Sequence, residues 1–330
     1  MKGISITILV LVSVVSIVLS LNFGAANIDV WQTTMCHLQS NDCAPSAFAN
    51  TIVFDIRLPR VITGFAVGAG LTLAGNILQG VTRNPLADPY LFGIVSGAGL
   101  GAVLGGIVAS ATGIQVPLTV LAFVGALGAV FIVVTVSAKH HWQRIDQVLL
   151  AGVAVSFLCT AVTSLLLYLD SPHAANRVIF WLMGSLANAD WQAVSLIVPV
   201  VLAGAFVVQG LTRQLDALQL SDDAIHALGI SISKLRMMLM LLVASMSAVI
   251  VAFCGGIGFV GLMVPHIVRQ LFGYRNSVSN VACVFAGGTF LVWVDVVARS
   301  ILPNQEIPIG IITAAIGSVF FIVLMSRRSA

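Results

Sequence analysis

Charged residues are scarce in this chain. Of its 330 residues, 59% are hydrophobic and only 8% are charged, whereas soluble globular domains carry about 25% charged residues. A chain this poor in charge cannot cover a surface that faces water, so a soluble domain is excluded as its main architecture. The net charge of +3 is too small, and the basic residues are too dispersed, for a nucleic-acid-binding surface.

Motifs for nucleotide and metal binding are also missing. No G-x-x-x-x-G-K-[ST] pattern occurs and no lysine follows a glycine, so the chain has no P-loop for a nucleotide phosphate. The five cysteines form no pair of C-x-x-C motifs, and no cluster of His, Asp and Glu suits a metal ion. We therefore predict that the chain is not an enzyme and binds no metal or cofactor. Any ATP that drives it would bind, with Mg²⁺, to another polypeptide.

Ionisable side chains are rare inside the apolar segments. Proton- and ion-coupled carriers place such residues in the membrane interior, where they mark the transport pathway. The main exception is Asp295, which stands four residues before Arg299 and is expected to pair with it along one helix. The sequence thus argues against a carrier driven by an ion gradient and against a membrane-embedded enzyme, which are the two alternatives.

The apolar residues fall into blocks long enough to cross a bilayer, which takes roughly 17–25 residues each. We predict a single all-α polytopic transmembrane domain over residues 1–330. Its eighth span is short and contains Pro265, and the stretch 178–187 is apolar but too short to cross. The first block is interpreted as a retained helix because its apolar run exceeds the roughly 7–15 residues of a signal core. About ten spans lie near residues 4–21, 61–81, 90–112, 114–138, 145–169, 192–211, 235–254, 256–272, 278–301 and 307–325.

Lysine and arginine are distributed unevenly between the two sides of these spans. If the N-terminus is cytoplasmic, only four of the 15 basic residues fall outside, a bias that favours cytoplasmic N- and C-termini in a bacterial inner membrane. Two connections exceed turn length, the polar outer loop 22–56 and the cytoplasmic loop 212–234. The outer loop holds Cys36 and Cys43, where the compartment permits a disulfide. The four outer basic residues are Arg57, Arg60, Arg177 and Arg299.

Glycine is abundant, with 30 residues, and part of it is regularly spaced. Gly64 and Gly68 stand four apart in the second predicted span. Small residues at this spacing allow helix backbones to approach closely in lipid. We interpret the pattern as helix packing within one subunit and not as a ligand site. The third span repeats it at Gly93, Gly97, Gly101 and Gly105.

Three motifs follow one another between about residue 50 and the C-terminus. The first runs from Arg57-Leu-Pro-Arg60 to Asn84-Pro-Leu-Ala-Asp-Pro89, the second is the glycine-rich segment 255–269, and the third is Glu306-Ile-Pro-Ile-Gly310. In this order and spacing they resemble the FecCD-type permeases of ABC importers, which carry iron-siderophores, haem and cobalamin. The resemblance implies the type II ABC importer permease fold, with ten membrane-spanning helices.

The resemblance also implies partners. Such a permease works as a dimer, here expected to be a homodimer, although a close heterodimer is the alternative. Two ATP-binding cassette subunits bind below it and hydrolyse ATP with Mg²⁺, and a periplasmic binding protein delivers cargo from above. We predict a ferric siderophore as the cargo, with haem and cobalamin as alternatives.

Arginines at the outer side are the predicted docking points for the binding protein. In proteins that resemble this one, arginines at the positions of Arg57, Arg60 and Arg299 meet glutamates of the binding protein. The planar guanidinium group suits this role because it pairs with carboxylates through two hydrogen bonds. The alternative is an interfacial anchor, or a partner for Asp55.

The segment 221–229 has the pattern of a short capped helix in the cytoplasmic loop. A serine is a plausible N-cap, two aspartates complement the helix dipole, and a final glycine fits the C′ position. An isoleucine and a leucine are expected to form one apolar face. The resemblance implies that this is the coupling helix that docks on the ATPase, and the alternative is a helix lying against the subunit's own underside. The residues are Ser221, Asp222, Asp223, Ile225, Leu228 and Gly229.

Overall fold

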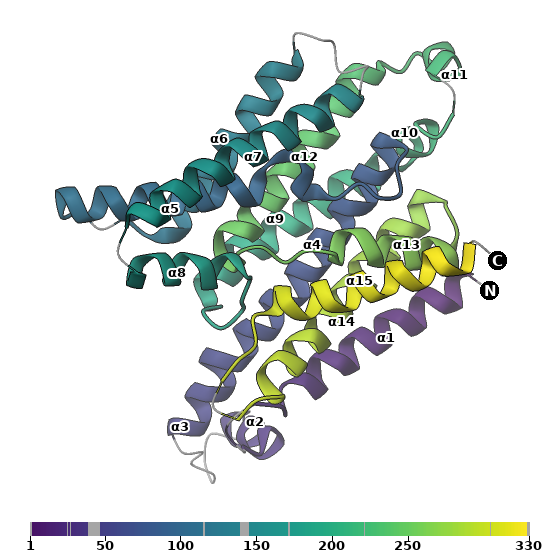
Figure 1. Ribbon diagram of the computed structural model, residues 1–330. Helices are drawn as coiled ribbons and strands as arrows, with labels where there is room; N and C mark the ends of the chain where they lie inside the picture. The colour runs from purple at the N-terminus through teal and green to yellow at the C-terminus, as the bar shows by residue number, and fades with distance from the viewer. Residues whose placement is uncertain are drawn as a thin grey trace.

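Helices make up all the regular structure in the described part of the chain (Figure 1). The computed structural model describes residues 2–24, 26, 28–38, 47–114, 116–138, 145–170, 172–220, 222–303 and 305–328. In chain order the helices are α1 (Lys2–Ser20), α2 (Val30–Leu38), α3 (Ala47–Asn50), the π-helix η1 (Thr51–Arg57), α4 (Leu58–Thr82), the 3-10 helix η2 (Pro89–Phe92), α5 (Ile94–Thr112), α6 (Leu118–Ala138), α7 (Ile145–Leu169), α8 (Pro172–Leu182), α9 (Trp191–Gly210), α10 (Thr212–Ala217), α11 (Asp222–Ala227), α12 (Ile232–Cys254), α13 (Val260–Phe272), α14 (Asn276–Ser300) and α15 (Ile309–Arg328).

The predicted all-α membrane fold is confirmed. Among the described residues, 8 helices are long and apolar enough to cross a membrane. Two shorter apolar helices, Ile6–Ser20 within α1 and Val260–Phe272, lie where the first and eighth spans were predicted. Figure 1 shows both chain termini on one side of the bundle, as an even number of spans requires. We call this side the terminal end and the opposite side, where α4 begins, the distal end.

The predicted outer loop contains helices, which corrects its assignment as a loop. In the segment 22–56, α2, α3 and η1 are helical, and one continuous helical run extends from Phe48 to Thr82. The apolar residues Ile52 and Val53 sustain this run, and Val53 is buried. Hydropathy ended the predicted span at the nearby arginines, because a charge normally marks the membrane boundary. In the segment 212–234, α11 is the short helix predicted there, and α10 precedes it as a further helix.

Helix α4 lies at the centre of the packing, and most of its residues are buried. Gly68 faces the backbone of Gly287 on α14, and Gly75 faces the backbone of Gly261 on α13. A Cβ at either position would overlap a carbonyl oxygen of the opposite helix. Glycine is therefore required at these two crossings, and α4 holds α13 and α14 at close range.

The glycine pattern of the third span is confirmed in part. Gly97 and Gly101 lie on α5 against Gly125 of α6, at a distance that leaves no room for a Cβ. Gly93 serves another purpose, because it stands before α5 in the left-handed region with φ +74°. There it ends η2 and turns the chain into α5, so its conformation and not helix contact requires glycine.

Replacing Gly75 with alanine should destabilise the bundle by about 1–3 kcal/mol, the usual cost of forcing an extra methyl group into a packed interior. Gly80, on the same helix, is the matched control because nothing lies within 4 Å of a Cβ built there. Gly80→Ala should be neutral or slightly stabilising. Thermal unfolding of the purified variants measures both, and equal melting temperatures would contradict the assigned crossing.

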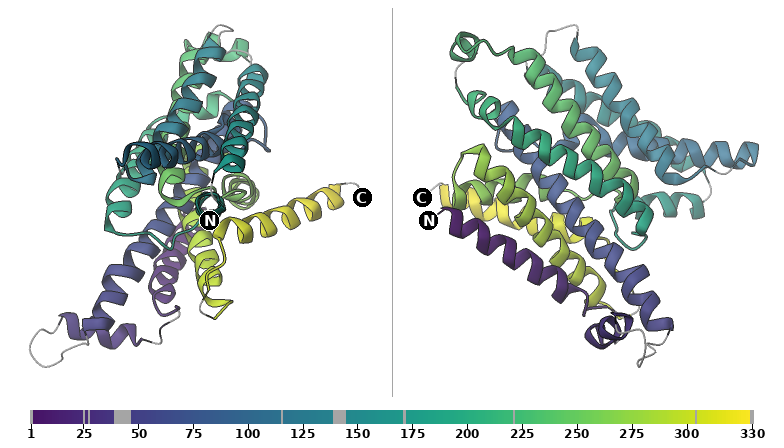
Figure 2. Two further views of the ribbon diagram at one scale, coloured as in Figure 1. Left: turned by 60° about the vertical axis from the view of Figure 1, so that its left-hand side comes forward. Right: turned by 180° about the vertical axis from the view of Figure 1, so that it is seen from behind.

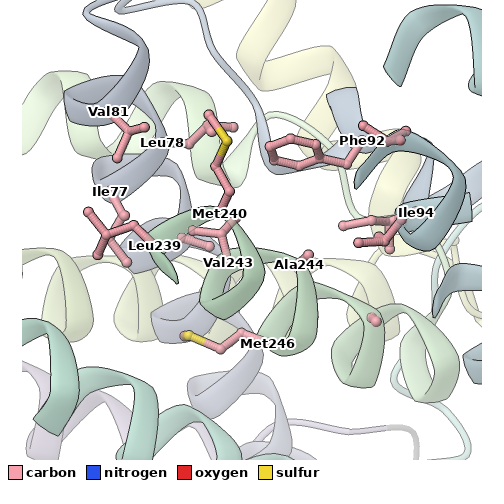
Figure 3. Packing of buried hydrophobic residues seen from close by; sticks show 14 of the residues in the cluster. Ile77, Leu78, Val81, Phe92, Ile94, Leu239, Met240, Val243, Ala244 and Met246 are labelled. Atoms are coloured by element: carbon pink, nitrogen blue, oxygen red, sulfur yellow. The ribbon is translucent and has the colours of Figure 1, made fainter. Parts of the chain in front are cut away.

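The core joins α4 to α5 through α12 (Figure 3). Leu78 of α4 and Met240 of α12 face each other, while Phe92 and Ile94 approach α12 from the other side. All four side chains are buried in one cluster. Since lipid chains are as apolar as these residues, close packing and not exclusion from water holds the helices together.

Candidate functional site

Arg60 occupies the centre of a charged cluster at the distal end. Its Nε and Nη2 donate to Asp295 of α14 at 2.8–3.1 Å, and its Nη1 and Nη2 donate to Glu306 at 2.7 and 2.9 Å. The Arg60 and Asp295 side chains are 8% and 3% exposed, whereas that of Glu306 is 42% exposed. The guanidinium group of Arg60 is thus fully engaged by carboxylates of its own chain.

Arg299 joins the same cluster from α14. Its Nε lies 3.4 Å from Asp295 Oδ2, which confirms the predicted pair along the helix, and its Nη2 donates to the carbonyl oxygen of Ser20 at 2.9 Å. Asp295 makes its shorter contacts with Arg60. The carboxylate therefore ties α4 to α14 in addition to pairing along its own helix.

Arg57 is held by backbone and not by Asp55, the partner considered from sequence. Its Nη1 donates to the carbonyl oxygen of Leu21 at 2.8 Å, and its Nη2 donates to that of Ala26. These bonds fasten the chain that leaves α1 onto the start of α4. Among the described residues, no carboxylate pairs with Arg57.

The structure brings the three predicted docking arginines together around one cavity of about 350 Å³, which Glu306 also lines. All three arginines are buried. Docking on the binding protein stays a prediction, and an incoming carboxylate would meet Glu306 before Arg60. Glu306 was not predicted as a site residue, although it opens the third motif.

Helix α11 confirms the predicted C-terminal cap. Gly229 has φ +74°, its N–H donates to the carbonyl oxygen of His226 at 2.9 Å, and Ile230 N–H donates to that of Ile225 at 3.3 Å. These two bonds form a Schellman motif, which satisfies the last carbonyls of the helix. The predicted N-cap, Ser221, lies outside the described residues.

The predicted apolar face of α11 is wrong. Ile225 is 0% exposed and packs in the core of the subunit, whereas Leu228 is 61% exposed. The two side chains therefore act in different places: Ile225 anchors the helix to its own subunit and Leu228 is available to a partner. Asp223 is exposed.

Arg83, just after α4, clamps the segment that carries α11. Its Nε donates to the carbonyl oxygen of Leu218 at 2.8 Å, and its Nη2 donates to that of Leu220 at 2.6 Å and to Asp222 Oδ1 at 2.7 Å. Asp222 Oδ1 also lies 3.6 Å from Arg236 Nη2. The charge distribution makes Arg83 one of the predicted cytoplasmic basic residues, and nothing local in the sequence indicates partners so far along the chain.

A second contact ties the same segment to α14. Asp216 Oδ1 on α10 accepts from the backbone N–H of Asn276 at 3.0 Å and from its Nδ2 at 2.7 Å, and so caps the first turn of α14. The segment with α10 and α11 is thus joined to both α4 and α14. These two helices also meet at the distal cluster, so they connect the two ends of the bundle.

The part of the chain that the structure describes contains no group of three or more His, Cys, Asp or Glu placed to hold a metal ion. The disulfide considered from sequence involves Cys43, which lies outside the described residues. Cys36 is buried on α2.

Comparison with known proteins identifies the family. The model of the FecCD transport family matches residues 10–327. The chain belongs to the FecCD transport family. It is 40% identical to the cobalamin import system permease protein of Halobacterium salinarum, over 85% of this chain and 74% of that protein. It is 35% identical to the hemin transport system permease protein of Yersinia pestis, over 94% of this chain and 91% of that protein.

Another relative and a solved structure are also similar to this chain. The chain is 34% identical to an Fe(3+) dicitrate transport system permease protein of Escherichia coli, over 84% of this chain and 83% of that protein. A metal-chelate type ABC transporter in an inward-facing conformation superposes with a TM-score of 0.86 at 32% identity, over 98% of this chain and 99% of that one. The FecCD motifs therefore correctly indicated both family and fold.

Proposed function

We propose that this chain is the permease subunit of an ABC importer for a metal chelate. Its membership in the FecCD transport family carries the proposal, because relatives named for cobalamin, hemin and ferric dicitrate each match most of its length. The chain would itself perform no chemistry. ATP and Mg²⁺ would bind to two partner ATP-binding cassette subunits, since no P-loop occurs in this sequence.

The permease would lie in the bacterial inner membrane with both termini in the cytoplasm, as the distribution of basic residues favours. The terminal end would then face the ATPase subunits and the distal end the periplasmic binding protein. A glutamate of that protein would compete with Glu306 for Arg60, and Arg57 and Arg299 would line the same docking cavity.

A second copy of the chain would complete the pathway. Helix α15 projects from the rest of the bundle (Figure 2), and its Ile311, Val319 and Ile322 are exposed. On α7, Phe157 is exposed as well. Apolar helix surfaces of this kind suit contact with another membrane-spanning helix, which supports a homodimer.

The mechanism would be alternating access. Closure of the ATPase subunits on ATP would push α11, and Arg83 and Asp216 would pass that movement to α4 and α14. Because the same two helices carry Arg60 and Asp295 at the distal end, the movement would reach the docking cavity. The close approach at Gly68 and Gly287 allows α4 and α14 to move as one body.

Leu228, the residue directly after α11, is the one expected to contact the ATPase. Leu228→Asp should lower ATP-dependent uptake strongly while the melting temperature of the permease stays unchanged, because this side chain is exposed. Ile225→Asp should instead destabilise the subunit, since it places a charge in the core. Uptake at the wild-type rate by Leu228→Asp would contradict the coupling role.

Uptake into proteoliposomes tests the proposed function as a whole. The permease would be reconstituted with its ATPase and binding protein, and a ferric siderophore, haem and cobalamin would be offered in parallel. We expect ATP-dependent uptake of one chelate, and we propose the ferric siderophore, with haem and cobalamin as alternatives. Uptake that ignores ATP and follows an imposed proton or sodium gradient would make the protein a secondary carrier instead.

A further inference from the structure

A polar cavity of about 370 Å³ lies at the terminal end, where α4 and α13 meet the start of α14 and the segment after α10. Two arginines, Arg83 and Arg269, line it together with the amides of Gln79, Gln219 and Asn276. No aspartate or glutamate is among its lining residues. The cavity is therefore rich in hydrogen-bond donors and carries positive charge.

Arg269 has no counter-ion within the described part of the chain. Its Nη1 donates to Asn76 Oδ1 at 3.2 Å, while its Nη2 is buried and has no hydrogen-bond partner. Arg60, Arg83, Arg236 and Arg299 each lie within 4 Å of a carboxylate oxygen, and Arg269 does not. A largely buried charge without a partner is costly, so a bound anion at this guanidinium group would stabilise the fold.

Arg83 offers a second donor to the same space. It uses Nε and Nη2 for the segment that carries α11, and among the described residues its Nη1 makes no hydrogen bond. Asn76, which holds Arg269 from one side, is itself fixed because its Nδ2 donates to Asn280 Oδ1 at 2.8 Å. Two guanidinium groups, one of them held in place, suit the oxygens of a phosphate.

We propose that this cavity binds a phosphate group, supplied either by free inorganic phosphate or by the headgroup of an anionic lipid. Arg269 is the principal ligand and Arg83 the second. The site is separate from the docking cavity, which lies at the other end of α4. The proposed phosphate binding depends only on the cavity and its arginines, so it does not require that the chain imports a chelate.

The test compares the full-length permease with Arg269→Gln and with Arg275→Gln. Arg275 is exposed on the same end of the bundle and does not line the cavity. Both variants remove one positive charge, so Arg275→Gln controls for the change in net charge. Delipidated protein is titrated with inorganic phosphate by calorimetry. In parallel, protein in nanodiscs of phosphatidylcholine, with or without phosphatidylglycerol, is assayed for retained lipid by native mass spectrometry.

We expect one saturable site per chain, weakened about tenfold or more by Arg269→Gln, as loss of a charged hydrogen-bond donor implies, and unchanged in Arg275→Gln. Phosphate binding in calorimetry identifies free phosphate as the source, and selective retention of phosphatidylglycerol identifies a lipid headgroup. Equal weakening by both variants, or no binding in either assay, overturns the proposal.

A measurement on the wild-type protein guards against a variant that does not fold. Tungstate is a heavy-atom oxyanion of similar shape, and a structure at saturating tungstate should show density between Arg269 and Arg83. An empty cavity under that condition overturns the proposal.

Discussion

Replacing Arg83 with alanine should reduce ATP-dependent uptake about tenfold while ATP hydrolysis by the assembled importer stays close to wild type. A factor of this size is within the roughly 5–150-fold by which coupled sites commonly affect one another. Arg83 binds two carbonyl oxygens and the Asp222 carboxylate of the segment that carries α11. The ion pair is partly exposed and so contributes little by itself. The loss arises because α11 could then move without moving α4.

The controls for Arg83 separate coupling from folding. Arg213 is exposed on α10 in the same segment, so Arg213→Ala should leave both activities unchanged. Arg83→Lys keeps the charge but cannot reach three acceptors at once, and it should fall between alanine and wild type. If uptake and hydrolysis decreased in parallel with the melting temperature, Arg83 would only hold the fold, and unchanged uptake would remove the clamp from the mechanism.

Replacing Arg60 with alanine should lower the free energy of unfolding by about 3–5 kcal/mol, the usual cost of removing one partner from a buried ion pair. Asp295 is buried, and without Arg60 its remaining partner among the described residues is Arg299, whose Nε lies 3.4 Å away. Denaturant or thermal unfolding of the purified permease measures the change, and the yield of folded protein from membranes should fall with it.

The double variant Arg60→Ala/Asp295→Ala should be more stable than Arg60→Ala alone, because it removes the carboxylate that would be left uncompensated. Glu306 is partly exposed and can turn to water. Arg177→Ala is the matched control, since Arg177 is also a basic residue of the predicted outer side but is exposed. A double variant as unstable as the sum of its single variants would contradict a coupled cluster.

Several patterns confined to neighbouring residues were predicted correctly. The apolar blocks located the spans, the glycine spacing indicated close helix packing in the third span, and Gly229 marked the end of α11. Asp295 and Arg299, four residues apart, pair as their spacing requires. Each of these features depends on helix geometry or on the local hydrophobicity of the chain, both of which can be determined from a short window of sequence.

Contacts between distant residues were not predictable in this way. Arg60 and Asp295 are 235 residues apart, and Arg83 and Asp222 are 139 apart. A window of sequence contains only one partner of such a pair, so an arginine that is buried and paired has the same appearance as one that faces a binding protein. Ile225 and Leu228 were assigned to one face because they are three residues apart, but α11 ends at Ala227 and Leu228 lies beyond it.

The sequence by itself determined a helical membrane protein of the FecCD type, because low charge, long apolar blocks and three ordered motifs are properties of the chain. Only the tertiary structure decided which charges neutralise one another and which do not. Helix packing places Arg60 between two carboxylates and leaves Arg269 facing a cavity without one. Electrostatic energy depends on distance and burial in space, and the order of residues along the chain specifies neither directly.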